Sequence, residues 1–290
     1  MECARQEMTQ VFAALRGERD WAWSGEALWA VGSLESLARP CVAIVGTRAA
    51  TAYGRRLAER FARELGAAGC TILSGLALGI DAAAHEGALA SGAATVGVIG
   101  GGHARFFPPR NLSLAERMLA AGGAVLSPYP PEHPALPHQF LERNAVVAAL
   151  ADAVVVVEAP QRSGALNTAN WAAGRIPVFA VPGDVDRAHV QGCHALIRDG
   201  AILARNAGDV LEVLSLAAAS GQATPPPTRD GLAGAILAFL ARGDADLDAL
   251  VAATAASAPT LLAALALLEC EGLVERSGAS WAHAAPAYRG

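Results

Sequence analysis

Six short apolar runs, separated by segments with helical periodicity, dominate the middle of the chain. They are rich in valine, isoleucine and leucine and cover residues 41–45, 71–73, 95–99, 124–126, 154–157 and 178–181. Runs without polar alternation are typical of strands buried on both faces. Because helical segments lie between them, the pattern predicts an α/β fold with a parallel sheet covered by helices on both sides.

The helices between these runs can be placed from side-chain spacing and capping signals. Large side chains recur at every fourth residue from Tyr53 to Leu65 and are expected to share one helix face. Asp81 is a candidate cap of the next helix. Ser113 and Glu116 have the spacing of a capping box.

The remaining sequence divides around this central part. We interpret residues 1–40 as a lead-in, 41–216 as the parallel α/β domain and 217–229, rich in alanine, proline and polar residues, as a linker. Residues 230–290 form a second compact unit. Its apolar spacing predicts three helices, the third over residues 259–272, followed by a hairpin from residue 273.

Composition excludes several classes of protein. The 22 basic residues are all arginines, so the lysine of a phosphate-binding P-loop is missing, and the net charge is −5. The five cysteines are odd in number and form no C-x-x-C pair, which argues against zinc ribbons and favours a reducing compartment, the cytoplasm. The N-terminus has no signal-peptide pattern. The most apolar stretch, residues 249–268, is interrupted by Thr254, Ser257 and Pro259, so no membrane span is predicted.

Four strand ends offer glycine, hydroxyl and arginine groups, at residues 46–48, 74–75, 100–102 and 162–168. Glycine lets a ligand approach the backbone, helix N-termini bind anions and arginine binds phosphate. Any one of these loops alone is typical of a turn. Four at one edge of a sheet favour an anionic ligand, with Arg48 and Arg143 as the strongest single candidates.

Signals of catalysis or of a bound cofactor are missing from the sequence. The seven histidines form no H-E-x-x-H or cysteine–histidine zinc pattern, and Ser74 does not lie in G-x-S-x-G. Residues 45–48 lack the G-x-G-x-x-G dinucleotide fingerprint. The sequence therefore favours a non-catalytic binding protein without metal or cofactor.

Several motifs occur in an order that resembles a known family. They include VAIVGTR at 42–48, LSGLALGIDAAAH at 73–85, FPPRN at 107–111, FLERN at 140–144, VEAPQRSGALNT at 157–168, VFAVPG at 178–183 and GCHALIRDGA at 192–201. In these segments the chain is similar to the DNA-processing proteins called DprA or Smf. The resemblance covers residues 25–216.

The resemblance implies an extended Rossmann-like fold that binds single-stranded DNA, protects incoming DNA in natural transformation and loads the recombinase RecA. It also implies a homodimer formed through this domain. Carried over residue by residue, the DNA-binding set is Gly46, Thr47, Arg48, Ser74, Gly75, Gly100, Gly101, Phe140, Arg143, Asn144, Ser163, Gly164 and Thr168. Phe140 would stack on a base, as aromatic side chains do in single-strand binders.

Two features depart from the family pattern. Before Phe140, where members often carry a basic residue, this chain offers only His138. The N-terminal stretch is too short for the helical DNA-binding domain of some members.

The second unit resembles the family's winged-helix tail, yet no basic residue lies between Arg242 and Arg276. We therefore interpret this tail as a partner-binding or packing module.

Two other functions remain as alternatives. Nucleotide phosphoribohydrolases of the LOG type have a related fold, but carry P-G-G-x-G-T followed by a catalytic glutamate. Here the corresponding loop is RSGALNT at 162–168, with Asn170 near the position of the acid. A winged-helix transcription regulator is the second alternative, against which the acidic tail argues.

Overall fold

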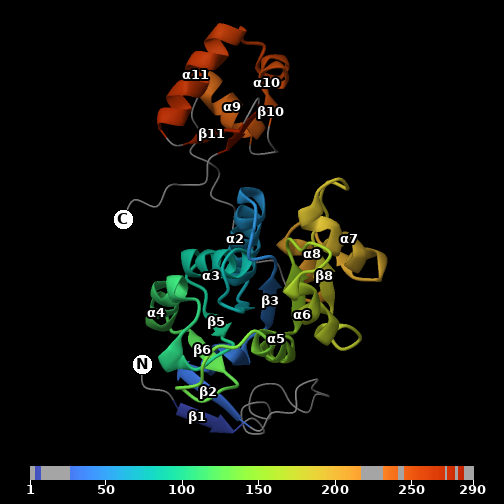
Figure 1. The fold of residues 1–290 in the computed structure, drawn as a ribbon. Coiled ribbons are helices and arrows are strands. Elements are labelled where there is room, and N and C mark those ends of the chain that lie inside the picture. Colours follow the sequence, from blue (N-terminus) through green and yellow to red (C-terminus); the bar gives the residue numbers. More distant parts are fainter. Residues whose placement is uncertain are drawn as a thin grey trace. The chain divides into compact units, whose positions relative to one another are not determined.

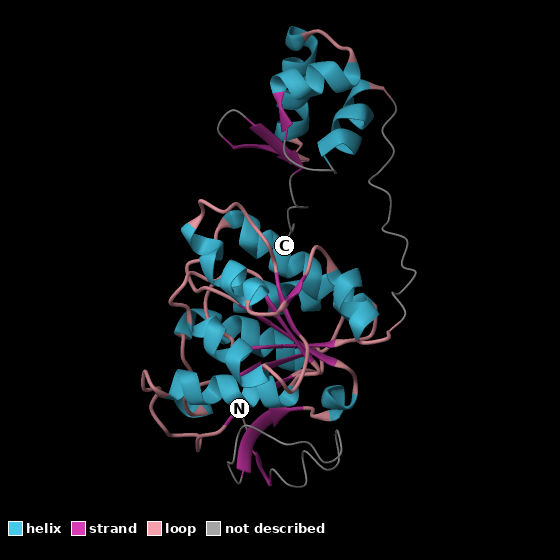
Figure 2. Ribbon diagram, turned by 90° about the vertical axis from the view of Figure 1, so that its right-hand side faces the viewer, coloured by secondary structure: helices cyan, strands magenta, loops and turns pink. Residues whose placement is uncertain are grey.

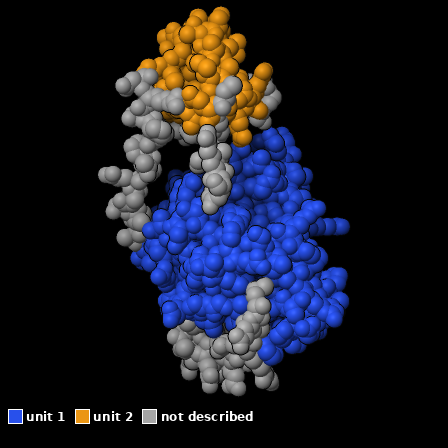
Figure 3. Space-filling model, turned by 90° about the vertical axis from the view of Figure 1, so that its left-hand side faces the viewer, with its two compact units in different colours: residues 1–220 blue, residues 221–290 orange. Residues whose placement is uncertain are grey.

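The computed structural model describes residues 4–7, 27–216, 231–240, 245–271, 273–277 and 280–283. The chain separates into two compact units, residues 1–220 and 221–290 (Figure 3). Each unit has its own buried apolar core.

The first unit contains a nine-stranded sheet with the order β1-β2-β6-β5-β4-β3-β7-β8-β9. Seven of these strands pair in parallel: β3 (Cys41–Val45), β4 (Thr71–Ser74), β5 (Thr95–Val98), β6 (Ala124–Ser127), β7 (Ala153–Val156), β8 (Val178–Ala180) and β9 (Ile202–Leu203). The first six are the predicted strands, each within one residue of its expected bounds. The prediction of a parallel α/β sheet is therefore confirmed.

The first 40 residues contribute more than a lead-in. Strand β2 (Ala27–Gly32) pairs antiparallel with β6, and β1 (Ala4–Glu7) pairs antiparallel with β2. Leu28 and Ala30 are buried in the same core as the parallel strands. These two strands cover the edge of the sheet that β6 would otherwise expose to solvent.

Helices cover both faces of the sheet (Figures 1 and 2). Along β3, Val42 and Ile44 pack with α2 (Ala52–Ala67), α3 (Ile80–Ala90) and α8 (Ala207–Val213), whereas Ala43 and Val45 pack with α5 (Gln139–Leu150) and α6 (Gly164–Ala172). This alternation is the two-residue period of a strand. Helices α4 (Leu112–Ala120) and α7 (Gln191–Arg198) complete the layers. Short 3-10 helices lie at Glu35–Ala38, His103–Arg105, Pro109–Asn111 and Ala188–Val190.

Two local helix predictions need correction. Leu57, Phe61 and Leu65 are buried on one face of α2, whereas Tyr53, in the first turn of the helix, is 56% exposed. Ser113 and Glu116 form no capping box, since α4 begins one residue earlier, at Leu112, directly after a 3-10 turn.

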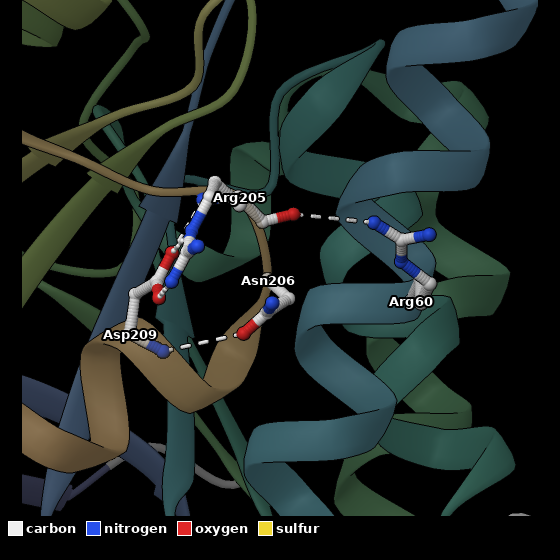
Figure 4. Close-up of polar contacts among 4 residues, drawn as sticks. All are labelled: Arg60, Arg205, Asn206 and Asp209. Carbon is white, nitrogen blue, oxygen red and sulfur yellow. Dashed lines mark hydrogen bonds and ion pairs between the residues drawn. The ribbon is translucent and has the colours of Figure 1, made fainter.

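Polar contacts join α8 to α2 (Figure 4). Arg205 pairs with Asp209, with 2.6 Å between Nη2 and Oδ1, and Asn206 caps α8 by accepting the Asp209 amide. The Arg60 guanidinium donates to the Arg205 carbonyl at 3.5 Å. Hydrogen bonds from Arg205 hold the pKa of Asp209 at about 2. This network joins the start of α8 to α2.

The second unit combines three helices with a small antiparallel sheet. The helices are α9 (Leu232–Leu240), α10 (Leu247–Thr254) and α11 (Ala258–Cys270), and the strands β10 (Ala245–Asp246), β11 (Val274–Ser277) and β12 (Ser280–His283) pair in the order β10-β12-β11. This is the predicted winged-helix arrangement, with β11 and β12 as the wing.

No single helix in the described residues could cross a membrane; α10 and α11 reach the required length and apolarity only as a pair bent by 106°.

The cysteines of the first unit behave as small apolar residues. Cys41, Cys70 and Cys193 are buried, as predicted. Burial raises the pKa of Cys70 to about 11 and that of Cys193 to about 12, so both remain thiols at neutral pH. Cys3 and the side chain of Cys270 lie outside the described residues.

Candidate nucleic-acid interface

The order of the parallel strands reverses between β3 and β7. Strands β3 to β6 add successively in one direction, and the chain then returns to place β7 on the other side of β3. Figure 1 shows β5 and β6 on one side of β3 and β8 on the other. Ligands of such sheets bind outside the carboxyl ends of the strands at this switch point. The loops that follow β3 and β7 carry Arg48 and Ser163. The fold thus brings two of the predicted site residues to the expected place.

An arginine and two aromatic rings form a surface cluster beside this switch point. Arg48 is exposed, and its Cζ lies 4.9 Å from the centroid of the Phe140 ring. The Phe107 ring lies 5.8 Å from Phe140, centroid to centroid, and Phe107 is 46% exposed. Sequence reasoning did not select Phe107, although its motif, FPPRN, was a signal. A cation and adjacent open rings suit a phosphate and its neighbouring base.

Arg143 does not reach the surface. It is 3% exposed, and its Nη1 donates hydrogen bonds to the carbonyls of Gly75 and Val98. Burial lowers the pKa of Arg143 to about 10, and the nearby Asp81 carboxylate opposes this shift. The expected phosphate contact is therefore replaced by a supporting role, because Arg143 ties together the carboxyl ends of β4 and β5.

Asp81 binds the loop after β4 instead of capping α3. Its Oδ2 accepts the amides of Gly75 at 3.1 Å and Ala77 at 3.4 Å, while the helix N-cap is Gly79. Burial raises the pKa of Asp81, and the Arg143 charge opposes that rise. The neighbouring Ser74 is also buried, and its hydroxyl donates to the Ile44 carbonyl at 2.6 Å. Ser74 and Gly75, two predicted contacts, thus lie below the surface.

The glycines after β5 allow close packing of another loop. A Cβ on Gly100 would lie 2.9 Å from the Phe140 ring, and one on Gly101 would lie 2.8 Å from the Ala135 Cβ. Gly102 donates its amide to the His133 carbonyl at 2.8 Å. Gly100 and Gly101, both predicted contacts, are buried: Gly100 makes room for Phe140 of α5, and Gly101 makes room for the loop between β6 and α5.

The N-terminus of α6 is open to solvent. Ser163 is its N-cap and accepts the Ala165 amide at 3.3 Å, and no atom lies within 4 Å of a Cβ built on the exposed Gly164. Asn144 on α5 donates to the Gly164 carbonyl at 3.1 Å and so fixes this turn. Thr168 is buried inside α6, at 1% exposure.

The loop after β3 contacts a residue that sequence reasoning did not select. Thr47 donates its amide to the Glu158 carbonyl at 2.7 Å, and the Glu158 carboxylate lies at the N-terminus of α2. Gly46 packs against the same residue, since its Cβ would lie 2.8 Å from the Glu158 carbonyl. The sequence signal for Glu158 was its position directly after the β7 run.

Within the described ranges, no three His, Cys, Asp or Glu side chains are grouped closely enough to hold a metal ion. His85 is fully buried with its Nδ1 2.7 Å from the Thr95 hydroxyl, and burial lowers its pKa to about 3. At neutral pH the buried His85 is therefore a neutral structural group.

Comparison with known proteins agrees with this architecture. The model of the family DNA recombination-mediator protein A matches residues 19–215, and that of the DprA winged helix domain matches residues 220–279. The chain belongs to the DprA family. A DprA-type DNA processing protein of Mycobacterium tuberculosis is 40% identical in an alignment of 287 residues that covers 93% of this chain and 72% of that protein. Protein Smf of Escherichia coli is 41% identical over 190 residues, which are 65% of this chain and 50% of Smf.

Solved DprA structures share the fold. DprA from Streptococcus pneumoniae superposes with a TM-score of 0.64 at 34% identity, over 73% of this chain and 74% of that one. DNA processing protein A from Helicobacter pylori, whose structure concerns its single-stranded DNA binding mode, gives a TM-score of 0.62 at 29% identity, over 74% of this chain and 96% of that one. The sheet of the first unit therefore has the fold of solved DprA proteins, and the second unit matches the DprA winged helix domain by sequence.

Proposed function

We propose that this DprA-family chain binds single-stranded DNA along the carboxyl edge of its parallel sheet and breaks no bond in it. The observation that carries the proposal is the exposed Arg48 guanidinium packed 4.9 Å from the centroid of the Phe140 ring at the switch point of the sheet. The single-stranded DNA binding mode of the Helicobacter pylori relative supports the same ligand.

In this proposal each surface residue contacts a different part of the DNA strand. Arg48 neutralises a phosphate, and Phe140 with Phe107 offers rings on which bases stack without sequence preference. The open amides at Ser163 and Gly164 take a neighbouring phosphate. The buried residues of the predicted set shape these loops.

A fluorescence-anisotropy titration with a labelled oligonucleotide tests the proposal. We expect Arg48→Ala to weaken binding about tenfold for all sequences and to reduce the salt dependence of the affinity, because one phosphate contact is lost. The control is Arg175→Ala, an exposed arginine in the loop before β8, at the opposite edge of the sheet. Wild-type binding that is absent or insensitive to salt would contradict the proposal.

We further propose that the DNA-bound chain is a cytoplasmic homodimer, joined through its first unit, that delivers the strand to RecA in natural transformation. Family membership supports these steps. RecA-dependent ATP hydrolysis on DNA coated with a single-strand-binding protein should start sooner when the chain is added. Release of a base from AMP, or a footprint on duplex DNA, would instead favour the phosphoribohydrolase or the regulator.

A further inference from the structure

The loop that carries Arg48, residues 46–51, is held at both ends by one residue. At its start the Thr47 amide donates to the Glu158 carbonyl at 2.7 Å. At its end the Thr51 amide donates to Glu158 Oε2 at 2.9 Å, and the Thr51 hydroxyl donates to Oε1 at 2.5 Å. Glu158 is 3% exposed. Three hydrogen bonds accepted by this buried residue thus fix the two ends of the loop that carries the exposed Arg48.

The carboxylate of Glu158 also fills the N-terminus of α2. Thr51 is the N-cap of this helix, and its hydroxyl accepts the Gly54 amide at 2.9 Å while donating to the carboxylate. Position 54 is a glycine because a Cβ there would lie 2.3 Å from the carboxylate carbon. Negative charge at a helix N-terminus is favourable. An internal carboxylate therefore occupies the place where a bound phosphate would otherwise lie.

This contact links the two sides of the switch point. Glu158 follows β7, whereas residues 46–51 follow β3. The open turn at Ser163 and Gly164 lies on the same connection as Glu158, between β7 and α6. The carboxylate therefore sets the position of the Arg48 loop relative to the α6 N-terminus.

We infer that Glu158 is a positioning residue for single-stranded DNA, acting through Arg48 without touching the strand. This inference rests on the proposed function. A long arginine side chain on a free loop would lose conformational entropy on binding, and a loop fixed in advance reduces that loss. If Glu158 instead acted by its charge alone, its carboxylate would repel the DNA phosphates, and removing it would strengthen binding.

The inference is tested by oligonucleotide titration of single and double variants of the full chain. We expect Glu158→Ala to weaken binding about five- to tenfold. Thr51→Val removes the hydroxyl contact to Glu158 together with the cap on the Gly54 amide but keeps the backbone contacts of Glu158, and should weaken binding by a smaller factor. Glu158→Gln keeps an acceptor for the Thr51 amide and should recover part of the affinity. Glu212→Ala, an exposed carboxylate on α8, is the matched control.

The double variant separates positioning from general damage to the fold. If Glu158 acts through Arg48, Glu158→Ala should have no further effect in the Arg48→Ala background. Backbone amide hydrogen exchange should increase in residues 46–55 of Glu158→Ala and stay unchanged in the strands of the sheet. Additive losses, unchanged binding by Glu158→Ala, or tighter binding from charge removal would each overturn the inference. Failure of the wild type to bind DNA would instead overturn the proposed function.

Discussion

At the scale of single residues, a buried pair shapes the loops below the surface cluster. Arg143 holds the carbonyls of Gly75 and Val98, and Asp81 holds the amides of Gly75 and Ala77. A Cβ on Gly75 would lie 2.1 Å from Arg143 Nη1, so the guanidinium packs directly on this glycine. The backbone of one loop is thus fixed by hydrogen bonds to a buried guanidinium and a buried carboxyl group.

Removal of one member of this pair should destabilise the protein. Arg143→Ala leaves the buried carbonyls of Gly75 and Val98 without their donor and removes the positive charge near Asp81, so it should lower the free energy of unfolding by about 2–5 kcal/mol. Adding Asp81→Asn should recover part of that loss, because the amide oxygen still accepts from the Gly75 amide. Urea unfolding checks both variants. A change below about 0.5 kcal/mol, as expected for the exposed Arg175→Ala, would contradict the supporting role.

His85 should make stability depend on pH. Its pKa is lowered from 6.5 to about 3, first by burial and then by the Arg143 charge. Between pH 6.5 and pH 3, His85 is protonated in the unfolded state but not in the folded state. The stability that comes from the neutral, buried His85 is therefore fully present above pH 6.5 and is lost as the pH falls toward 3. The loss should approach about 1.4 kcal/mol per pH unit. Urea unfolding at pH 7, 6 and 5 should show a steeper decline for wild type than for His85→Gln.

At the scale of elements, glycines with the same sequence signal serve different purposes. Gly101 lies against Ala135 of the loop between β6 and α5, whereas Gly164 opens α6 with free space around it. Small residues after strands therefore do not identify a ligand site until the neighbouring loop is known.

The two alanine variants should differ in stability. Gly101→Ala forces the loop at Ala135 outward and should cost about 1–3 kcal/mol. Gly164→Ala meets no atom within 4 Å and should change stability by no more than about 0.5 kcal/mol. Thermal unfolding of both proteins is the measurement, and equal stabilities would contradict the packing role of Gly101.

At the scale of the whole molecule, the two units differ in their suitability for DNA. Helix α11, which would enter a groove in a duplex-reading winged helix, contains no basic residue. Leu262 and Leu267 are exposed on it, at 45% and 67%, and Asp246 and Asp248 add negative charge nearby in the sequence. The first unit carries the exposed Arg48 cluster.

Single-stranded DNA binding should therefore reside in the first unit. A chain ending at residue 216 should bind an oligonucleotide within about threefold of the full chain, and more tightly at low salt because acidic residues are removed. Anisotropy at two salt concentrations checks this expectation. A loss of about tenfold or more would place a major contact in the second unit.

The sequence by itself determined the layered fold, because burial on both faces of a parallel strand imposes an unbroken apolar run that can be recognised locally. It also located the loops at the switch point, including Arg48. The strands of the first 40 residues were not recognised, since β2 becomes a strand by pairing with the distant β6.

Only the tertiary structure decided which polar side chains reach the surface. Arg48 and Arg143 carry the same guanidinium, yet Arg48 is exposed beside the half-buried Phe140 ring, whereas Arg143 is buried and bonded to carbonyls at the ends of β4 and β5. Glu158 accepts a hydrogen bond from the amide of Thr51, which lies 107 positions earlier in the sequence. The exposure and hydrogen bonding of a side chain depend on segments that are far apart in the chain and pack together in the fold. The local sequence pattern does not specify that packing.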